Sequence, residues 1–285
     1  MPSQPSVPGP VEAIIFDIGD TLLGFPVASW DEVDRASIDA LRSAMEQSPQ
    51  RAGAIGAARD GVPPGETLLA LYREVVEALN RTALPELKEV PARRVLEQML
   101  RRLGITAGDA ELDRLERAWA APRLAIRRLY PEVPRVLAGL RRHGVRLGVI
   151  SNIWLSGGIV REHLDSLGLM EPFETVVLSS EVGYVKPHPV LFSMALEQMG
   201  VKPAASWYVG DNPHADVAGA KAAGMRAALV ERPPQLRFHP SPPPDDRPYT
   251  GPPPDLVLSD LTGLLSLVEG SRPLSERAPG VPHAG

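Results

Sequence analysis

Three apolar runs in this chain each end in a short polar loop, and the loops follow one another in a fixed order. The three segments are residues 11–17, 145–152 and 206–211. Short apolar runs of this kind are typical of strands that are buried on both faces of a parallel sheet. Because the carboxyl ends of parallel strands meet at one edge of the sheet, the loops are expected to build one polar site.

After residue 131 the sequence alternates between helical and strand-like patterns, with a glycine after several of the helices. Repeated units of this kind predict an α/β fold with a doubly wound, Rossmann-like parallel sheet. We assign residues 11–24 and 129–268 to this core. The expected helices are 134–142, 159–167, 190–199 and 215–223, and the expected strands are 11–17, 145–150, 175–178, 206–209, 226–230 and 255–258.

Residues 25–128 have a different pattern, in which apolar side chains recur at helical spacing. Examples are Val33, Ile38 and Leu41 in one stretch and Leu68, Leu71, Tyr72 and Val75 in another. Two further helices are expected at 92–103 and 110–120. We interpret the block as an inserted all-helical cap domain that lies above the strand ends as a lid.

Proline, glycine and serine are concentrated in three segments, which are too poor in apolar residues to pack well. We expect residues 1–10 to be a disordered leader and residues 269–285 a disordered tail. Residues 232–254 are expected to form a proline-rich surface loop within the core.

The composition argues against several classes of function. The net charge of -5 argues against a general basic surface that would bind nucleic acid. The absence of cysteine excludes disulfides and thiolate sites. No apolar run approaches the ~20 residues that span a bilayer, so no membrane association is expected. Residues 1–10 lack the basic and apolar parts of a secretory signal, and we expect a cytoplasmic protein.

Asp17 stands at the end of an apolar strand, where a carboxylate is costly unless a cation or several hydrogen-bond donors face it. The residue could simply cap its loop. A carboxylate in this position can also attack phosphorus and form an acyl phosphate.

Asp211 ends a later strand, and Asp216 falls in the first turn of the helix that follows. Carboxylates in these positions can face one hard cation, and Mg²⁺ prefers oxygen ligands. Asp216 could alternatively interact only with the dipole of its helix, and the two roles are compatible.

Ser151, Asn152 and Lys186 are further candidates for binding a phosphate. A short hydroxyl and the following backbone N–H can hold a phosphate oxygen, although Ser-Asn is also an ordinary turn. Lys186 precedes a helix that starts with proline, and it could neutralise the clustered acids. A lone lysine is more often only a surface charge.

Together these residues resemble the motifs of the haloacid dehalogenase superfamily of phosphohydrolases, over most of the chain from Ala13 to about Leu267. The segment 16–22 resembles the first motif, 151–152 the second, 186–187 the third, and 210–216 the fourth. The block 25–128 resembles the helical cap of the subfamily whose lid lies between the first two motifs.

The resemblance implies an Mg²⁺-dependent phosphatase that cleaves a small-molecule phosphate ester. It assigns Asp17 as the nucleophile that becomes an aspartyl phosphate. It further implies that Mg²⁺ is held by Asp17, the carbonyl of Gly19, Asp211 and Asp216, and that the phosphoryl group is bound by Thr21, Ser151, Asn152 and Lys186. The physiological substrate is left open, and so is the choice between monomer and homodimer.

One position departs from the pattern of the family's phosphatases, which carry a second aspartate two residues after the nucleophile. Gly19 occupies this position here, and an acid follows it as Asp20. We count Asp20 and Lys186 with Asp17 as catalytic candidates, although Asp20 could instead be a structural loop cap. The departure leaves two alternatives open: a 2-haloacid dehalogenase, or a catalytically weak protein that binds phosphate and Mg²⁺.

Overall fold

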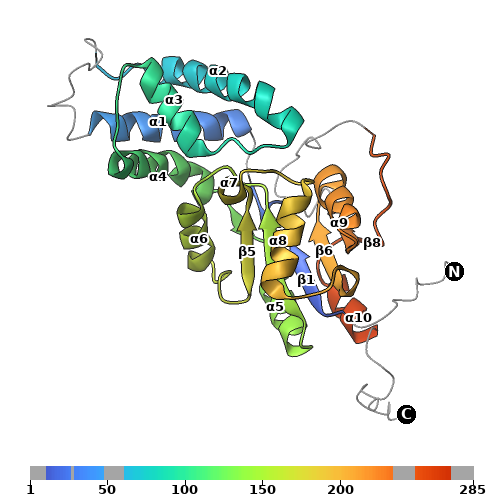
Figure 1. The fold of residues 1–285 in the computed structure, drawn as a ribbon. Coiled ribbons are helices and arrows are strands. Elements are labelled where there is room, and N and C mark those ends of the chain that lie inside the picture. The colour runs from blue at the N-terminus through green and yellow to red at the C-terminus, as the bar shows by residue number, and fades with distance from the viewer. Residues whose placement is uncertain (1–10, 27–28, 48–60, 234–247, 271–285) are drawn as a thin grey trace, which may run out of the picture.

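The computed structural model describes residues 11–26, 29–47, 61–233 and 248–270. Its main sheet has six strands in the order β5-β4-β1-β6-β7-β8, and all neighbouring strands are parallel (Figure 1). The predicted doubly wound α/β sheet is therefore confirmed. The strands are β1 (Ala13–Phe16), β4 (Arg146–Ser151), β5 (Thr175–Leu178), β6 (Ser206–Gly210), β7 (Arg226–Val230) and β8 (Leu256–Leu258).

The central strand β1 is buried on both faces, as its uninterrupted apolar sequence predicts. Ile14 and Phe16 pack into the hydrophobic cluster on one face of the sheet, whereas Ala13 and Ile15 pack into the cluster on the other. All four side chains are fully enclosed. Asp17 comes directly after this strand and is held at its carboxyl end.

Helices cover both faces of the sheet. The cluster on one face includes side chains of α5 (Val133–Arg142), α6 (Gly157–Ser166) and α10 (Gly263–Gly270). The cluster on the other includes side chains of α8 (Pro189–Met199) and α9 (Ala218–Ala222). A π-helical turn, Pro213–Val217, precedes α9, and shorter helices lie at α7 (Ser179–Val182), Leu84–Glu86 and Pro203–Ala205.

Four helices form a separate group above the sheet (Figure 1). They are α1 (Trp30–Glu46), α2 (Gly65–Ala83), α3 (Ala92–Arg102) and α4 (Asp109–Ala125). The chain enters this helical group through β2 (Leu23–Gly24) and leaves it through β3 (Arg128–Leu129), and these two strands form an antiparallel ribbon. Helix α4 extends beyond its expected end at residue 120 and continues past Pro122.

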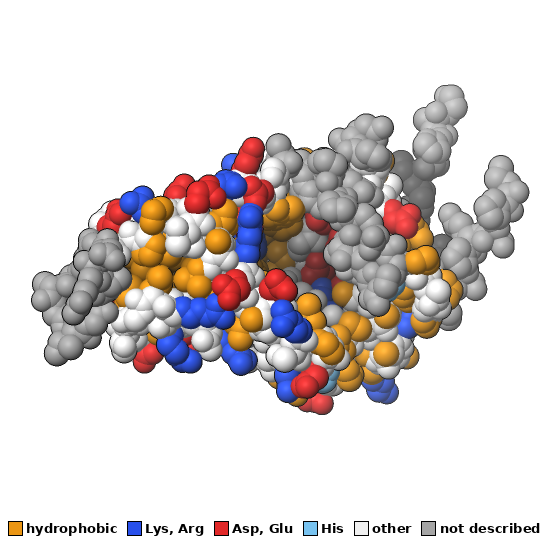
Figure 2. All heavy atoms as spheres, turned by 90° about the horizontal axis from the view of Figure 1, so that it is seen from above, with side chains coloured by type: hydrophobic (Ala, Val, Ile, Leu, Met, Phe, Trp, Pro, Cys, Tyr) orange, Lys and Arg blue, Asp and Glu red, His pale blue; other side chains and the backbone are white. Residues whose placement is uncertain are grey.

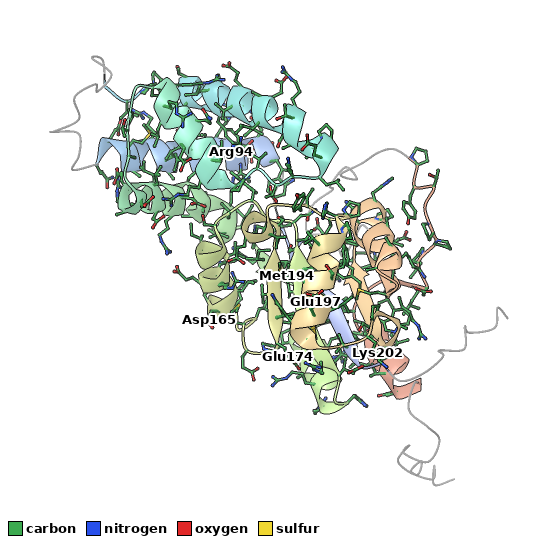
Figure 3. The ribbon with its side chains drawn as sticks, in the orientation of Figure 1. Arg94, Asp165, Glu174, Met194, Glu197 and Lys202 are labelled. Atoms are coloured by element: carbon green, nitrogen blue, oxygen red, sulfur yellow. The ribbon has the colours of Figure 1, made fainter. Side chains whose placement is uncertain are left out.

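The helical group lies at the carboxyl ends of the strands. Glu174 and Lys202, which precede β5 and β6, lie at the opposite end of the sheet, whereas Arg94 of α3 lies within the helical group (Figure 3). Backbone hydrogen bonds attach the group to the core: Ala92 N donates to Trp154 O at 2.7 Å, and Val185 N donates to Leu87 O at 2.8 Å. The second attachment is adjacent to Lys186.

Two of the expected segment boundaries were wrong. Arg232, which we had assigned to the proline-rich surface loop, is only 4% exposed, and its guanidinium donates to Glu132 and to the carbonyl of Thr21. Residues 269 and 270, assigned to the tail, belong to α10, whose Leu264 and Leu267 anchor the helix in the core. The leader 1–10, the loop residues 234–247 and the tail residues 271–285 lie outside the described residues.

Among the helices that the structure describes, none is long and apolar enough to cross a membrane.

Candidate active site

A cavity of about 190 Å³ lies at the carboxyl ends of β1, β4 and β6. Seen from above, this face of the molecule is hollowed, with acidic and basic side chains at the floor of the hollow (Figure 2). The cavity contains nearly all of the side chains that the sequence singled out. It is lined by Asp17, Gly19, Asp20, Ser151, Asn152, Lys186, Asp211, Asn212, Ala215 and Asp216.

Asp17 is 7% exposed and is held from two sides. Its Oδ1 accepts hydrogen bonds from Ser151 Oγ at 3.0 Å and from Lys186 Nζ at 2.7 Å. Its Oδ2 accepts none from the residues that the structure describes. One carboxylate oxygen is therefore fixed by the protein, while the other can interact with a ligand.

Lys186 is a buried cation and not a surface charge, with a side chain only 3% exposed. Its Nζ lies 2.7 Å from Asp17 Oδ1, 2.7 Å from Asp216 Oδ1 and 2.9 Å from the hydroxyl of Tyr208. Burial opposes its charge, but the carboxylates of Asp17 and Asp216 prevail and raise the pKa of Lys186 well above its ordinary value. Lys186 therefore carries a proton at neutral pH.

Asn152 positions Lys186 through the main chain. Its Oδ1 accepts from Lys186 N at 2.7 Å, and its Nδ2 lies 3.4 Å from Lys186 O. A side-chain amide can donate and accept at once, which suits it to clamping one peptide segment. The sequence had indicated only a phosphate contact for this residue.

Tyr208 was missed in the sequence because it lies within an apolar strand, where an aromatic residue is read as packing. Its hydroxyl accepts from Lys186 and donates to Ile150 O at 2.7 Å. Burial raises the pKa of Tyr208 well above its ordinary value, so the phenol is neutral. The hydroxyl provides Lys186 with a third oxygen acceptor.

Asp17, Asp211 and Asp216 form one acidic cluster, in which one oxygen of each lies within 4.8 Å of the others. Burial and then the carboxylates of Asp216 and Asp17 raise the pKa of Asp211 well above its ordinary value. Burial likewise raises the pKa of Asp216, although Lys186 opposes the shift. Three oxygen donors at this separation, with their negative charge under-compensated, suit a hard divalent cation.

The backbone of the fourth motif explains why a glycine precedes Asp211. A Cβ at Gly210 would lie 2.2 Å from Asp216 Oδ2, closer than any real contact. Any side chain at this position would displace the carboxylate. Asp216 is held in its place by Asn212 N, which donates to Oδ2 at 2.9 Å.

Residues 19–21 follow Asp17 and differ in their access to the cavity. Gly19 and Asp20 line it, and Asp20 has a left-handed backbone with φ of 49°, which aspartate tolerates better than most residues. Thr21 is not brought to the cavity. Its side chain is fully buried, and its Oγ1 has no hydrogen-bond partner in the described part of the chain.

Comparison with known proteins places the chain in a family. The model of the family described as haloacid dehalogenase-like hydrolase matches residues 66–230, which is more than half of the 285 residues. A glyceraldehyde 3-phosphate phosphatase of Methanopyrus kandleri is 30% identical over 78% of this chain and 84% of its own length. The chain therefore belongs to the haloacid dehalogenase-like hydrolase family, and it is a hydrolase.

Other relatives match over shorter segments. A phosphoserine phosphatase of Thermus thermophilus is 46% identical, but over only 36% of this chain and 41% of its own length.

Among solved structures, a 2-haloacid dehalogenase of Pseudomonas syringae is 25% identical with a TM-score of 0.58 and covers 90% of this chain and 98% of its own. A HAD phosphatase of Thermococcus onnurineus has the same fold, with 21% identity, a TM-score of 0.56 and coverage of 92% and 99%.

Proposed function

We propose that this hydrolase is an Mg²⁺-dependent phosphatase that cleaves a small-molecule phosphate ester through an aspartyl phosphate on Asp17. The observation that carries the proposal is the position of Asp17 between a buried lysine and two further carboxylates in one cavity. The relatives named as phosphatases, including those for phosphoserine and glyceraldehyde 3-phosphate, support the same reaction class.

In the proposed reaction Asp17 Oδ2 attacks phosphorus, the bond from phosphorus to the ester oxygen breaks, and the alcohol leaves after taking up a proton. Water then attacks the phosphorus of the aspartyl phosphate, which releases inorganic phosphate and regenerates the carboxylate. Lys186 and Ser151 orient Asp17 through Oδ1. The ammonium of Lys186 also offsets charge that develops on the transferring group.

The donor set of the acidic cluster fits Mg²⁺, since it consists of carboxylate oxygens close enough to share one ion. Asp17, Asp211 and Asp216 would hold it, with the main-chain carbonyl of Gly19 as a further ligand. When bound, the ion would supply positive charge beside the phosphoryl oxygens.

Proton transfer to the leaving group is assigned to Asp20. Gly19 carries no side chain, whereas Asp20 is an acid that lines the same cavity. The assignment matters most for alkyl phosphates, whose leaving alcohols need a proton. General acid catalysis is typically worth ~10²–10⁴-fold in rate.

A second candidate, cleavage of 2-haloacids, is favoured by the missing carboxylate at Gly19 and by the dehalogenase of Pseudomonas syringae. Halide departure needs no proton, so that chemistry does not call for an acid at this position. The presence of both Asp211 and Asp216 favours phosphoryl transfer over this alternative.

The test is hydrolysis of p-nitrophenyl phosphate with Mg²⁺ and after chelation, beside 2-chloropropionate. We expect phosphate release that requires Mg²⁺ and is lost in Asp17→Asn, while Asp165→Asn, an exposed aspartate on α6 (Figure 3), behaves like the wild type. Equal turnover by Asp17→Asn would contradict the assignment of the nucleophile. Chloride release without phosphate release would favour the dehalogenase, and Mg²⁺ binding without either reaction would favour a binding protein.

A further inference from the structure

Arg127 lies at the point where the chain returns from the helical group to the sheet, and its guanidinium has no acceptor among the residues that the structure describes. Its Nε is enclosed and has no hydrogen-bond partner, and no carboxylate pairs with this side chain in the part of the chain that the structure describes. The neighbouring arginines have acceptors for their terminal nitrogens: Arg123 pairs with Asp34, although its Nε is also unpaired, and Arg128 donates to the carbonyl of Ala125 at 2.5 Å. A largely desolvated cation without an acceptor is costly, so the position calls for an explanation.

The position of Arg127 connects it to the cavity through Phe25. The guanidinium carbon lies 5.6 Å from the centre of the Phe25 ring. The same ring lies 3.7 Å from the point where a Cβ on Gly19 would be, and that point is 3.8 Å from Asp17 Oδ2. The Phe25 ring is therefore close both to the guanidinium of Arg127 and to Asp17 Oδ2, the oxygen that we assign to nucleophilic attack.

The electrostatic surroundings of Arg127 favour an anion. Burial and then the positive charge of Arg123 lower the pKa of Arg127 to about 10, against the opposing influence of Asp17. The side chain is still cationic at neutral pH. Asp34 pairs with Arg123 and does not form an ion pair with Arg127.

We propose that Arg127 binds a second anionic group of the substrate, a carboxylate or a second phosphate, while the scissile phosphate lies beside Asp17 and Lys186. A guanidinium presents a planar set of donors that matches either group, and pairing would compensate the desolvated charge. The inference rests on the proposed phosphatase function. It defines the substrate class as a short phosphate ester that is charged at both ends.

Three compounds with the same three-carbon skeleton test the inference: glycerol 3-phosphate, 3-phosphoglycerate and glycerol 1,3-bisphosphate. Their far ends carry a neutral alcohol, a carboxylate and a phosphate. In Arg127→Gln we expect kcat/KM for one of the two charged compounds, divided by that for glycerol 3-phosphate, to fall about 10- to 100-fold, as the loss of a charge-assisted hydrogen bond predicts. The compound whose ratio falls identifies the second group as carboxylate or phosphate.

The matched control is Arg128→Gln, which removes the adjacent, exposed guanidinium and should leave all the ratios unchanged. Unchanged ratios in Arg127→Gln as well would overturn the inference and would leave Arg127 with only its packing against Phe25. Equal losses for all three compounds would have the same meaning, since they would indicate a general structural role.

Equilibrium binding separates this inference from the proposed function. If the wild type hydrolyses none of the three compounds and also fails with p-nitrophenyl phosphate, the phosphatase proposal fails. Calorimetric titration of the full chain with the same compounds then decides the inference. Tighter binding of a charged compound than of glycerol 3-phosphate, lost in Arg127→Gln, would support it, whereas equal binding would overturn it.

Discussion

Lys186 Nζ lies 2.7 Å from Asp17 Oδ1, and this contact joins two residues that are 169 positions apart. The same nitrogen contacts Asp216, so one buried cation holds the proposed nucleophile and a proposed metal ligand together. A lysine that serves two enclosed carboxylates cannot be removed without leaving them uncompensated. Its contributions to folding and to turnover are therefore coupled.

For Lys186→Met we expect both lower stability and loss of turnover. Breaking a buried ion pair by removing one partner typically costs about 3–5 kcal/mol in the free energy of unfolding. Chemical denaturation measures this cost, and hydrolysis of p-nitrophenyl phosphate measures the turnover. Lys202→Met, which removes an exposed lysine far from the cavity (Figure 3), is the control. A Lys186→Met protein as stable as this control would contradict the structural role.

Tyr208→Phe tests the third acceptor of Lys186. The change removes the bonds of the hydroxyl to Lys186 and to Ile150 O but keeps the ring packed. We expect a cost of about 1–3 kcal/mol in unfolding free energy, since a buried carbonyl loses its donor, together with a moderate fall in kcat. Tyr249→Phe removes a more exposed hydroxyl that also bonds a carbonyl, and it should cost less. The reverse order of stability would refute the role assigned to Tyr208.

Asp20→Asn tests proton transfer to the leaving group. Asparagine tolerates the left-handed backbone at this position, so the change removes the charge without disturbing the turn. We expect kcat for an alkyl phosphate to fall by ~10²-fold or more, and kcat for p-nitrophenyl phosphate to fall much less, because its leaving group needs little acid. Equal losses for both compounds would exclude Asp20 as the general acid.

Gly19→Asp in the Asp20→Asn background should restore hydrolysis of the alkyl phosphate. A Cβ at Gly19 meets only ordinary contacts, 3.7 Å from Phe25 and 3.8 Å from Asp17 Oδ2, so a carboxylate can be introduced beside the proposed nucleophile. The Gly19→Ala change in the same background fills the space without an acid and should restore nothing. If the alanine variant recovers as much activity as the aspartate variant, the effect is one of packing.

Glu89 offers a test of pH-dependent stability in the attachment of the helical group. It accepts from Val90 N at 2.9 Å and from Ser179 Oγ, but burial prevails and raises its pKa above the ordinary value of 4.5. The folded state therefore holds the proton more tightly than the unfolded state. The stabilisation that this provides is complete below the unfolded pKa and is lost as pH rises through the folded pKa.

The measurement is the difference in unfolding free energy between the wild type and Glu89→Gln, whose amide does not titrate. We expect the wild type to lose stability relative to the variant as pH rises above the ordinary glutamate pKa of 4.5 and through the raised pKa of the folded state. A difference that is flat, or that changes in the opposite direction, would show that the Glu89 carboxyl does not have a raised pKa.

Much of the core was predictable because it depends on local patterns. The apolar run before Asp17 and the alternation after residue 131 specify buried strands and covering helices, whatever their neighbours are. Helix α10 and the ribbon of β2 and β3 were not predicted. Both are short. Helix α10 forms through packing on the side of the sheet that helix α5 covers, and the ribbon forms through the pairing of residues 23–24 with 128–129. Local sequence encodes neither interaction.

The amino-acid sequence by itself determined the parallel sheet, the inserted helices and the polar residues at the strand ends, because strand and helix periodicity is a property of neighbouring residues. Only the tertiary structure decided how these residues act on one another. It buried Lys186 between Asp17 and Asp216, used Asn152 to clamp Lys186, kept Thr21 away from the cavity and left Arg127 without an acceptor among the described residues. Such relations depend on which distant segments pack together, since burial and charge pairing are set by three-dimensional proximity.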